Sequence, residues 1–181
     1  MQCFHCAYAV FPSRVSEAAS LYVNFGSLPT RKNPSPFSAF IGLIDGFDAD
    51  RKYFADQLKH CSLDYHILEA VDGRSGLEVC KSRQVDCVVL EITLQDLSVL
   101  EVLMTLVPRA SKPRIAVIVL TQLSYRGIWE LAKEHGAYVC FVKQHTTSED
   151  LYRAIQRAVT LVGQLPKEDR YRPILAPPPI H

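Results

Sequence analysis

The amino-acid sequence predicts an α/β domain built on a five-stranded, doubly wound parallel sheet. Five short runs rich in β-branched or aromatic residues follow residue 38, and segments long enough for helices separate them. The third and fourth runs are almost continuously apolar, which is typical of strands in a sheet covered by helices on both faces. Right-handed crossovers between such strands produce the doubly wound arrangement. The predicted strands lie within 40–45, 65–71, 86–92, 114–121 and 138–143.

The segments between these runs carry helix signals. Asp48 stands just before a helical pattern and is predicted to cap it, and Gly136 is predicted to end the fourth helix. Thr147 and Asp150 have the spacing of a capping box at the start of the last helix. The apolar face of that helix is formed by Leu151, Ala154, Ile155, Ala158, Val159 and Val162.

Changes in composition divide the chain into three parts. Residues 1–38 show no sustained periodicity and end in a Pro/Ser-rich stretch, so we expect a mostly irregular extension with at most a short helix at 14–23. Residues 39–163 contain the α/β domain. Residues 164–181 are charged and then Pro-rich, which indicates a disordered or polyproline-like tail.

The composition argues against several functional classes. The formal net charge is +1 and the Lys and Arg residues are scattered, so neither nucleic acid nor an anionic membrane is an expected partner. No run approaches the roughly 20 apolar residues of a membrane-spanning helix. Four of the six cysteines fall within or beside apolar patterns, as free thiols do in a reducing cytoplasm, and Cys3, His5 and Cys6 form only half of a zinc site. We therefore expect a cytoplasmic protein with a protein partner.

Polar residues end the predicted strands. Asp45, Glu91, Thr121 and Lys143 all lie at carboxyl ends, which meet along one edge of a parallel sheet. A carboxylate at the end of a buried strand is costly unless it is paired, so Glu91 is predicted to lie within reach of Lys143. No Ser/His/Asp or Cys/His arrangement, phosphate loop or dinucleotide fingerprint occurs, so no catalytic residues are predicted.

These motifs together resemble the receiver domain of bacterial two-component response regulators. The stretches LIDGFDADR, VDCVVLEITLQDLSVLEVL, VIVLT and GAYVCFVK have the order and spacing of that family, over about two-thirds of the chain. The resemblance implies a flavodoxin-like sheet with strand order 2-1-3-4-5. It also implies a non-enzymatic role in phosphorelay signal transduction, with a histidine kinase or a downstream regulator as partner.

The resemblance implies a role for each residue at the sheet edge. In the family an acidic pair holds Mg²⁺, an Asp after the third strand accepts a phosphoryl group, and a Thr or Ser and a Lys bind the phosphoryl oxygens. Asp45 matches the first metal-binding acid, Thr121 the switch hydroxyl and Lys143 the charged partner. Phe141 is taken as the aromatic residue that moves with the threonine. Glu91 occupies the position of the phosphoacceptor.

Several departures from the family pattern affect this site. Glu91 is longer than Asp by one methylene, and a shift of about 1 Å in a reacting group can lower a rate by on the order of 100-fold. Gly46 stands where the second acid is usual, so Mg²⁺ binding is expected to be weak and Asp45 a weak or vestigial ligand. Gln122 is expected to crowd the site. Gln144 replaces a usual Pro, which predicts a trans peptide bond and a shifted loop.

Three interpretations of Glu91 remain open from sequence. Its permanent charge imitates the phosphorylated state, or it pairs with Lys143 in a site that has lost its chemistry, or it is itself phosphorylated. We predict a stand-alone, atypical receiver that acts by protein contact. The alternative is a Mg²⁺-dependent receiver that a histidine kinase still phosphorylates.

Two apolar surfaces are candidates for that contact. Trp129 and Tyr125 are predicted on one side of the fourth helix, where they form an interface or where Trp129 packs at the edge of the core. The segment 99–107 is apolar nearly all round, so the N-terminal extension or a partner is expected to cover it. A homodimer is one such arrangement.

Overall fold

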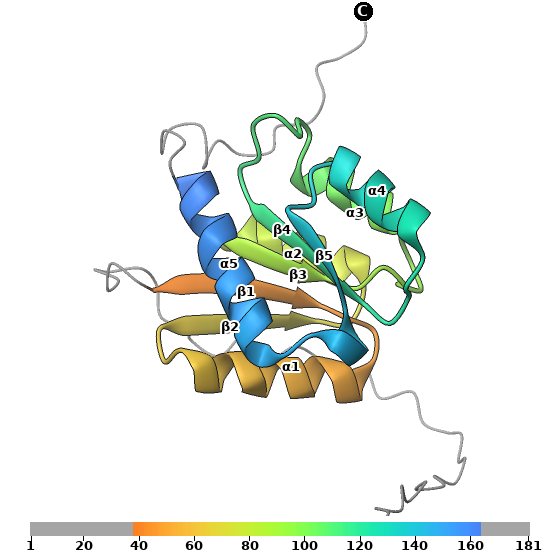
Figure 1. Cartoon of the computed structure of the whole chain (residues 1–181). Coiled ribbons are helices and arrows are strands. Elements are labelled where there is room, and N and C mark those ends of the chain that lie inside the picture. Colours follow the sequence, from red (N-terminus) through yellow and green to blue (C-terminus); the bar gives the residue numbers. More distant parts are fainter. Residues whose placement is uncertain (1–37, 164–181) are drawn as a thin grey trace, which may run out of the picture. The chain divides into compact units, whose positions relative to one another are not determined.

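A computed structural model describes residues 38–163 and shows a five-stranded parallel sheet with the order β2-β1-β3-β4-β5 (Figure 1). The fold class and strand order predicted from sequence are therefore confirmed. The strands are β1 (Ala39–Ile44), β2 (Tyr65–Ala70), β3 (Cys87–Leu90), β4 (Ala116–Thr121) and β5 (Val139–Val142). The helices are α1 (Asp48–Cys61), α2 (Gly73–Ser82), α3 (Val99–Leu106), α4 (Arg126–Glu134) and α5 (Ser148–Gly163), with a 3₁₀ turn η1 (Lys143–His145) after β5. The expectations for 14–23, for Cys3, His5 and Cys6, and for the tail lie outside the described residues.

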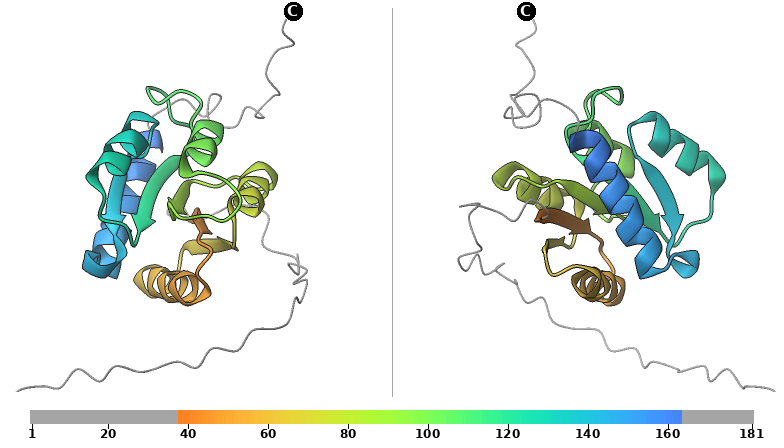
Figure 2. Two further views of the ribbon diagram at one scale, coloured as in Figure 1. Left: turned by 90° about the vertical axis from the view of Figure 1, so that its right-hand side faces the viewer. Right: turned by 60° about the vertical axis from the view of Figure 1, so that its left-hand side comes forward.

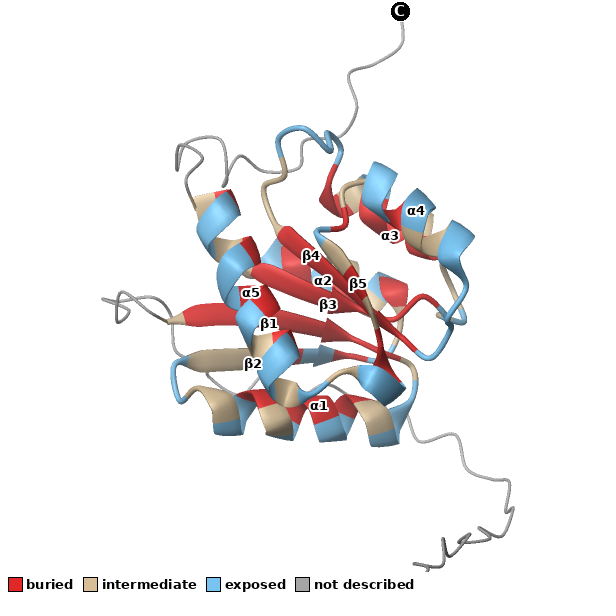
Figure 3. Ribbon diagram, viewed as in Figure 1, coloured by how far each residue is buried: buried red, intermediate tan, exposed pale blue. Residues whose placement is uncertain are grey.

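The sheet is the middle layer of three. Helices α1 and α5 cover one face, and α2, α3 and α4 cover the other (Figures 1 and 2). Every residue of β1, β3 and β4 is buried, as Figure 3 shows along the centre of the sheet. This burial explains why these strands read as apolar runs without alternation. Helix α3 also packs against the sheet through its apolar residues and leaves Met104 exposed. Its buried residues are Val99, Val102, Leu103 and Leu106.

The helix ends predicted from the sequence are observed, except at the start of α1. Gly136 follows α4 with a φ of +98°, a left-handed conformation that glycine adopts readily. The Thr147 hydroxyl accepts a hydrogen bond from the Asp150 N–H at 3.1 Å, and the Asp150 carboxylate accepts one from the Thr147 N–H at 3.2 Å. This capping box is confirmed.

The predicted capping role of Asp48 is wrong. Helix α1 begins at Asp48 itself, and Phe47 is the capping position, without a side-chain hydrogen bond. The Phe47 carbonyl already accepts from the Arg51 N–H at 2.9 Å, so the helix starts one residue earlier than the capping pattern suggests. The Asp48 carboxylate instead pairs with the Arg51 guanidinium.

Candidate functional site

A buried lysine lies at the centre of the carboxyl edge of the sheet. Lys143 begins the η1 turn, and its ammonium Nζ lies 2.6 Å from Asp45 Oδ2, 2.8 Å from Asp50 Oδ2 and 2.8 Å from Glu91 Oε2. The side chains of Asp45 and Glu91 are 3% and 1% exposed, so these are buried ion pairs. The sequence predicted that Asp45, Glu91 and Lys143 lie together, and the structure places them so.

Glu91 is held through both carboxylate oxygens. Oε1 accepts hydrogen bonds from the Ile92 N–H at 2.7 Å, the Thr93 N–H at 3.1 Å and the Thr121 hydroxyl at 2.6 Å. Oε2 is buried and faces Lys143 as an ion pair without the geometry of a hydrogen bond. These partners offset the cost of burying a charge at the end of β3.

Hydrogen bonds continue from Glu91 to α4. The Thr121 hydroxyl oxygen accepts from the Leu123 N–H at 3.1 Å, and the Leu123 carbonyl accepts from the Trp129 indole N–H at 3.2 Å. These hydrogen bonds form a relay of four residues, Glu91–Thr121–Leu123–Trp129. It connects the buried carboxylate with the surface of a helix.

Asp50 belongs to the cluster although the sequence analysis did not select it. Its carboxylate accepts from Lys143 and also from the Gln122 side-chain amide, at 2.8 Å each. Gln122 is exposed and covers the edge of the cluster through this bond, and the expected crowding of the site stays a prediction. The stretch LIDGFDADR places Asp50 in the first turn of the helix after β1, and the direction of that helix brings Asp50, but not Asp48, to the cluster.

The charges of the cluster shift the pKa values of its members. Burial raises the pKa of Asp45 and outweighs its hydrogen bonds from Lys143 and Phe47, and the Glu91 charge raises it further. Burial acts to lower the pKa of Lys143, but its hydrogen bonds to Asp45 and Asp50 and the ion pair with Glu91 reverse this and raise it. For Asp50, burial acts to raise the pKa, and the bonds from Lys143 and Gln122 leave it lowered. The ammonium is therefore firmly held in its charged form.

Phe141 does not lie next to Thr121. Side chains alternate between the two faces of a strand, and Phe141 packs into the core between the sheet and α1 and α5 together with Leu120. Thr121 follows Leu120 and so faces the opposite side. Val142, which is paired with Thr121, and Cys140 are the β5 residues on that side, and the Cys140 sulfur lies 3.8 Å from the Trp129 carbonyl oxygen. A shift of one residue in a strand exchanges the faces, which is why the sequence alone selected the wrong neighbour.

The two aromatic residues proposed for an interface differ in exposure. Trp129 is partly buried against the core, and its indole N–H is bonded within the chain. Tyr125 is 71% exposed at the start of α4, with Leu123 beside it at 46%. The exposed apolar surface thus lies on the β4–α4 loop, next to the relay.

Gln144 and His145 follow Lys143 in the η1 turn. Both side chains are exposed. The described residues contain no cis peptide bond, so the trans bond predicted at Gln144 is confirmed.

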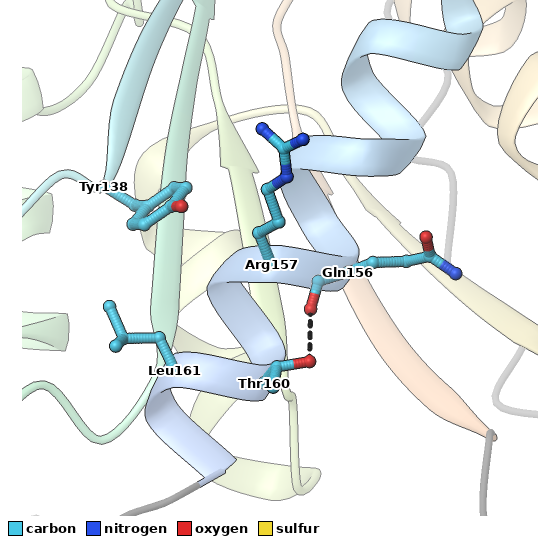
Figure 4. A pocket seen from close by; sticks show the side chains of 5 residues that line it. All are labelled: Tyr138, Gln156, Arg157, Thr160 and Leu161. Carbon is cyan, nitrogen blue, oxygen red and sulfur yellow. Dashed lines mark hydrogen bonds between the residues drawn. The ribbon is translucent and has the colours of Figure 1, made fainter.

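A shallow pocket of about 320 Å³ lies elsewhere, between the start of β5 and the last turns of α5 (Figure 4). Its lining consists of Tyr138, Gln156, Arg157, Thr160 and Leu161. The Thr160 hydroxyl donates to the Gln156 backbone carbonyl at 2.8 Å, which is a bond within the helix. No residue of the charged cluster lines this pocket.

The sequence profile of the response regulator receiver domain matches residues 41–156. The chain belongs to the response regulator receiver family. Receiver domains are signalling modules of two-component systems rather than enzymes in the usual sense, and they interact with histidine kinases and downstream partners. Within residues 38–163, no helix is long and apolar enough to cross a bilayer.

Solved receiver domains share the fold at low sequence identity. A receiver domain protein from Clostridium thermocellum is 24% identical with a TM-score of 0.60, and the match covers 68% of this chain and 95% of that one. A CheY-like receiver from Methanospirillum hungatei is 16% identical (TM-score 0.61; 70% and 98% covered). The receiver of an HD domain-containing protein from Pseudomonas fluorescens is 19% identical (TM-score 0.62; 71% and 99% covered). Among curated proteins, no match was found.

Proposed function

We propose that this receiver domain takes part in phosphorelay signalling without being phosphorylated, and that Glu91 supplies the charge that a phosphoryl group supplies elsewhere in the family. One observation carries the proposal. The Thr121 hydroxyl donates to Glu91 Oε1 at 2.6 Å, while Lys143 pairs with Oε2 at 2.8 Å. The hydroxyl and the ammonium that would bind phosphoryl oxygens are thus already engaged by one side chain. The extra methylene of Glu allows this reach, which favours the charge-mimic interpretation over loss of function.

The relay offers a path from this site to a protein partner. Thr121 cannot leave Glu91 without also disturbing its bond from Leu123, and Leu123 in turn accepts from Trp129. The exposed side chains of Leu123 and Tyr125 lie at the end of this path. Aromatic and apolar side chains of this kind are enriched in protein interfaces. We infer that a histidine kinase or a downstream regulator contacts this surface.

Phosphorylation is the direct test. We expect the purified chain, incubated with acetyl phosphate and MgCl₂, to keep its intact mass. Thr121 and Lys143 already engage the two Glu91 oxygens, and the extra methylene shifts the carboxylate from the position of an acceptor Asp. A receiver domain with Asp at this position, treated in parallel, controls for the activity of the donor. Stoichiometric gain of one phosphoryl group would instead support the alternative, a Mg²⁺-dependent receiver phosphorylated by a histidine kinase.

Thr121→Val tests whether the relay transmits the state of Glu91. The substitution keeps the shape of the side chain but removes the hydroxyl that bonds Glu91 and Leu123. We expect a red shift in the fluorescence of Trp129, the chain's only tryptophan, because the carbonyl that holds its indole is released. We also expect at least about tenfold weaker binding to the partner, the loss expected for one buried charge-assisted hydrogen bond.

Three further variants complete this test. Thr121→Ser retains the hydroxyl and should leave both the spectrum and the binding close to wild type. Glu91→Gln removes the negative charge and should lose partners that a pull-down against sensor kinases of the same cell finds with the wild type. Equal binding by the wild type, Glu91→Gln and Glu91→Asp would leave only a scaffold role.

A further inference from the structure

The loop between β3 and α3, residues 92–98, is fastened to α2 by one side chain. Asp96 Oδ1 accepts a hydrogen bond from the Gly73 N–H at 2.8 Å, and Oδ2 accepts one from the Arg74 N–H at 2.8 Å. These two donors begin α2 and lie 23 and 22 residues earlier in the chain. The first N–H groups of a helix have no partner within the helix, and a negative charge is favourable there. Asp96 is therefore a helix cap that comes from another element.

Helix α2 also has a cap of its own. The Asp72 carboxylate accepts from the Ser75 N–H at 2.8 Å, and the Ser75 hydroxyl oxygen accepts from the Asp72 N–H at 3.3 Å, which forms a capping box. The start of α2 is thus specified locally. The two bonds of Asp96 use the N–H groups that this box leaves over, those of Gly73 and Arg74. They add a link between two elements to a helix that is already capped.

The two ends of the loop are fastened locally. At its start, the N–H groups of Ile92 and Thr93 donate to Glu91 Oε1 at 2.7 and 3.1 Å. At its end, the loop runs into the capping box of α3. Both fastenings join residues within a few positions of one another, whereas Asp96 reaches across to α2. The middle of the loop therefore depends on Asp96 for its place in the fold.

Packing and charge favour this contact. The loop residue Leu97 lies against the backbone of α2, because a Cβ atom at Gly73 would be only 3.0 Å from Leu97 Cβ. Burial acts to raise the pKa of Asp96, but the hydrogen bonds from the Gly73 and Arg74 N–H groups outweigh it and lower the pKa. Asp96 is thus an anion near pH 7, and charge-assisted hydrogen bonds are stronger than neutral ones.

We propose that Asp96 is a latch that holds the β3–α3 loop against α2 and thereby positions the two N–H groups that bond Glu91 Oε1. With the latch closed, the loop and the start of α2 move as one body. When the latch is released, the ends of the loop stay attached and its middle leaves α2, so the N–H groups of Ile92 and Thr93 lose their fixed direction. Asp96 is a positioning residue, because it acts on Glu91 only through the loop. The inference rests on these hydrogen bonds and holds whether or not Glu91 acts as a charge mimic.

Amide hydrogen exchange, measured by NMR on the full chain, tests the latch. Asp96→Ala removes both acceptor oxygens, and we expect about tenfold faster exchange or more at two separate places, α2 and the start of the loop. The amides concerned are those of Gly73, Arg74, Ile92 and Thr93. Asp96→Asn keeps one acceptor oxygen and should give a smaller acceleration. The amides of β1 should exchange as in the wild type in both variants.

Asp150→Asn is the matched control. Its carboxylate also caps a helix, by accepting from the Thr147 N–H at 3.2 Å, but both residues belong to the start of α5. This variant should leave the loop amides unchanged. Equal acceleration across the whole sheet in Asp96→Ala would overturn the proposal, because the residue would then support the fold in general. Unchanged exchange at Ile92 and Thr93, with acceleration confined to α2, would also overturn it.

The comparison does not depend on a single variant. If Asp96→Ala does not fold, Asp96→Asn carries the same contrast between the loop and β1. Neither phosphorylation nor a partner enters the measurement, so failure of the latch is distinguishable from failure of the proposed signalling role.

Discussion

Lys143→Met is expected to lower the free energy of unfolding by about 3–5 kcal/mol near pH 7. Removing one member of a buried ion pair leaves the other charge uncompensated, and losses of about this size follow. Here two buried carboxylates, Asp45 and Glu91, lose their common partner. Methionine fills most of the volume of lysine, so the loss reports the charge rather than a cavity. The free energy of unfolding is measured by urea titration, monitored by circular dichroism.

The pH dependence of this loss has a definite sign. The folded-state pKa of Lys143 is raised, so its contribution to stability is present below the pKa of an unfolded lysine, about 10.4, and is lost as the pH rises through the folded value. The raised pKa of Asp45 means that the folded state takes up its proton more readily than the unfolded state. The loss caused by Lys143→Met should therefore shrink as the pH falls and Asp45 takes up its proton, and it should also shrink as the pH rises through the folded pKa of Lys143.

Lys81→Met is the matched control. Lys81 pairs with Glu78 at 2.9 Å on the surface of α2, where the two side chains are 52% and 72% exposed. Exposed pairs contribute at most about 1 kcal/mol, so this variant should stay close to wild type. Similar small losses at both lysines would show that the buried cluster does not support the fold.

Leu151→Ala is expected to destabilise the domain by about 2–5 kcal/mol. Leu151 is fully buried in the first turn of α5 and packs in the core between the sheet and helices α1 and α5. Truncation removes buried methyl groups and leaves a cavity that the surrounding strands fill only in part. Because α5 follows the η1 turn that carries Lys143, the ion-pair cluster should also loosen. Urea unfolding measures the change.

Leu161→Ala on the same helix provides the comparison. Leu161 is 53% exposed, and substitutions at such positions usually change stability by no more than about 0.5 kcal/mol. A loss at Leu161 as large as that at Leu151 would mean that the exposed end of α5 is covered by something outside the described residues.

The strands and the meeting of the edge residues were predictable from short-range pattern, whereas the strand order came from the resemblance to receiver domains. Fully buried parallel strands require continuous apolar runs, and these are visible in the letters of β3 and β4. The carboxyl ends of parallel strands share one edge whatever the details of packing. The convergence of Asp45, Glu91, Thr121 and Lys143 therefore followed from the fold class alone.

Other features depend on angles and distances that no local pattern contains. Asp50 joins the cluster because of the direction in which α1 leaves the sheet, and Asp48, two residues earlier, turns outward to Arg51. Phe141 and Cys140 are neighbours in sequence, yet the pleat of β5 sends one to each face. The relay to Trp129 depends on a backbone carbonyl of the β4–α4 loop, which carries no side-chain signal. The sequence by itself determined that Asp45, Glu91 and Lys143 meet at this edge. The tertiary structure added Asp50 and decided the partners of each charge, because hydrogen bonds depend on tenths of an ångström.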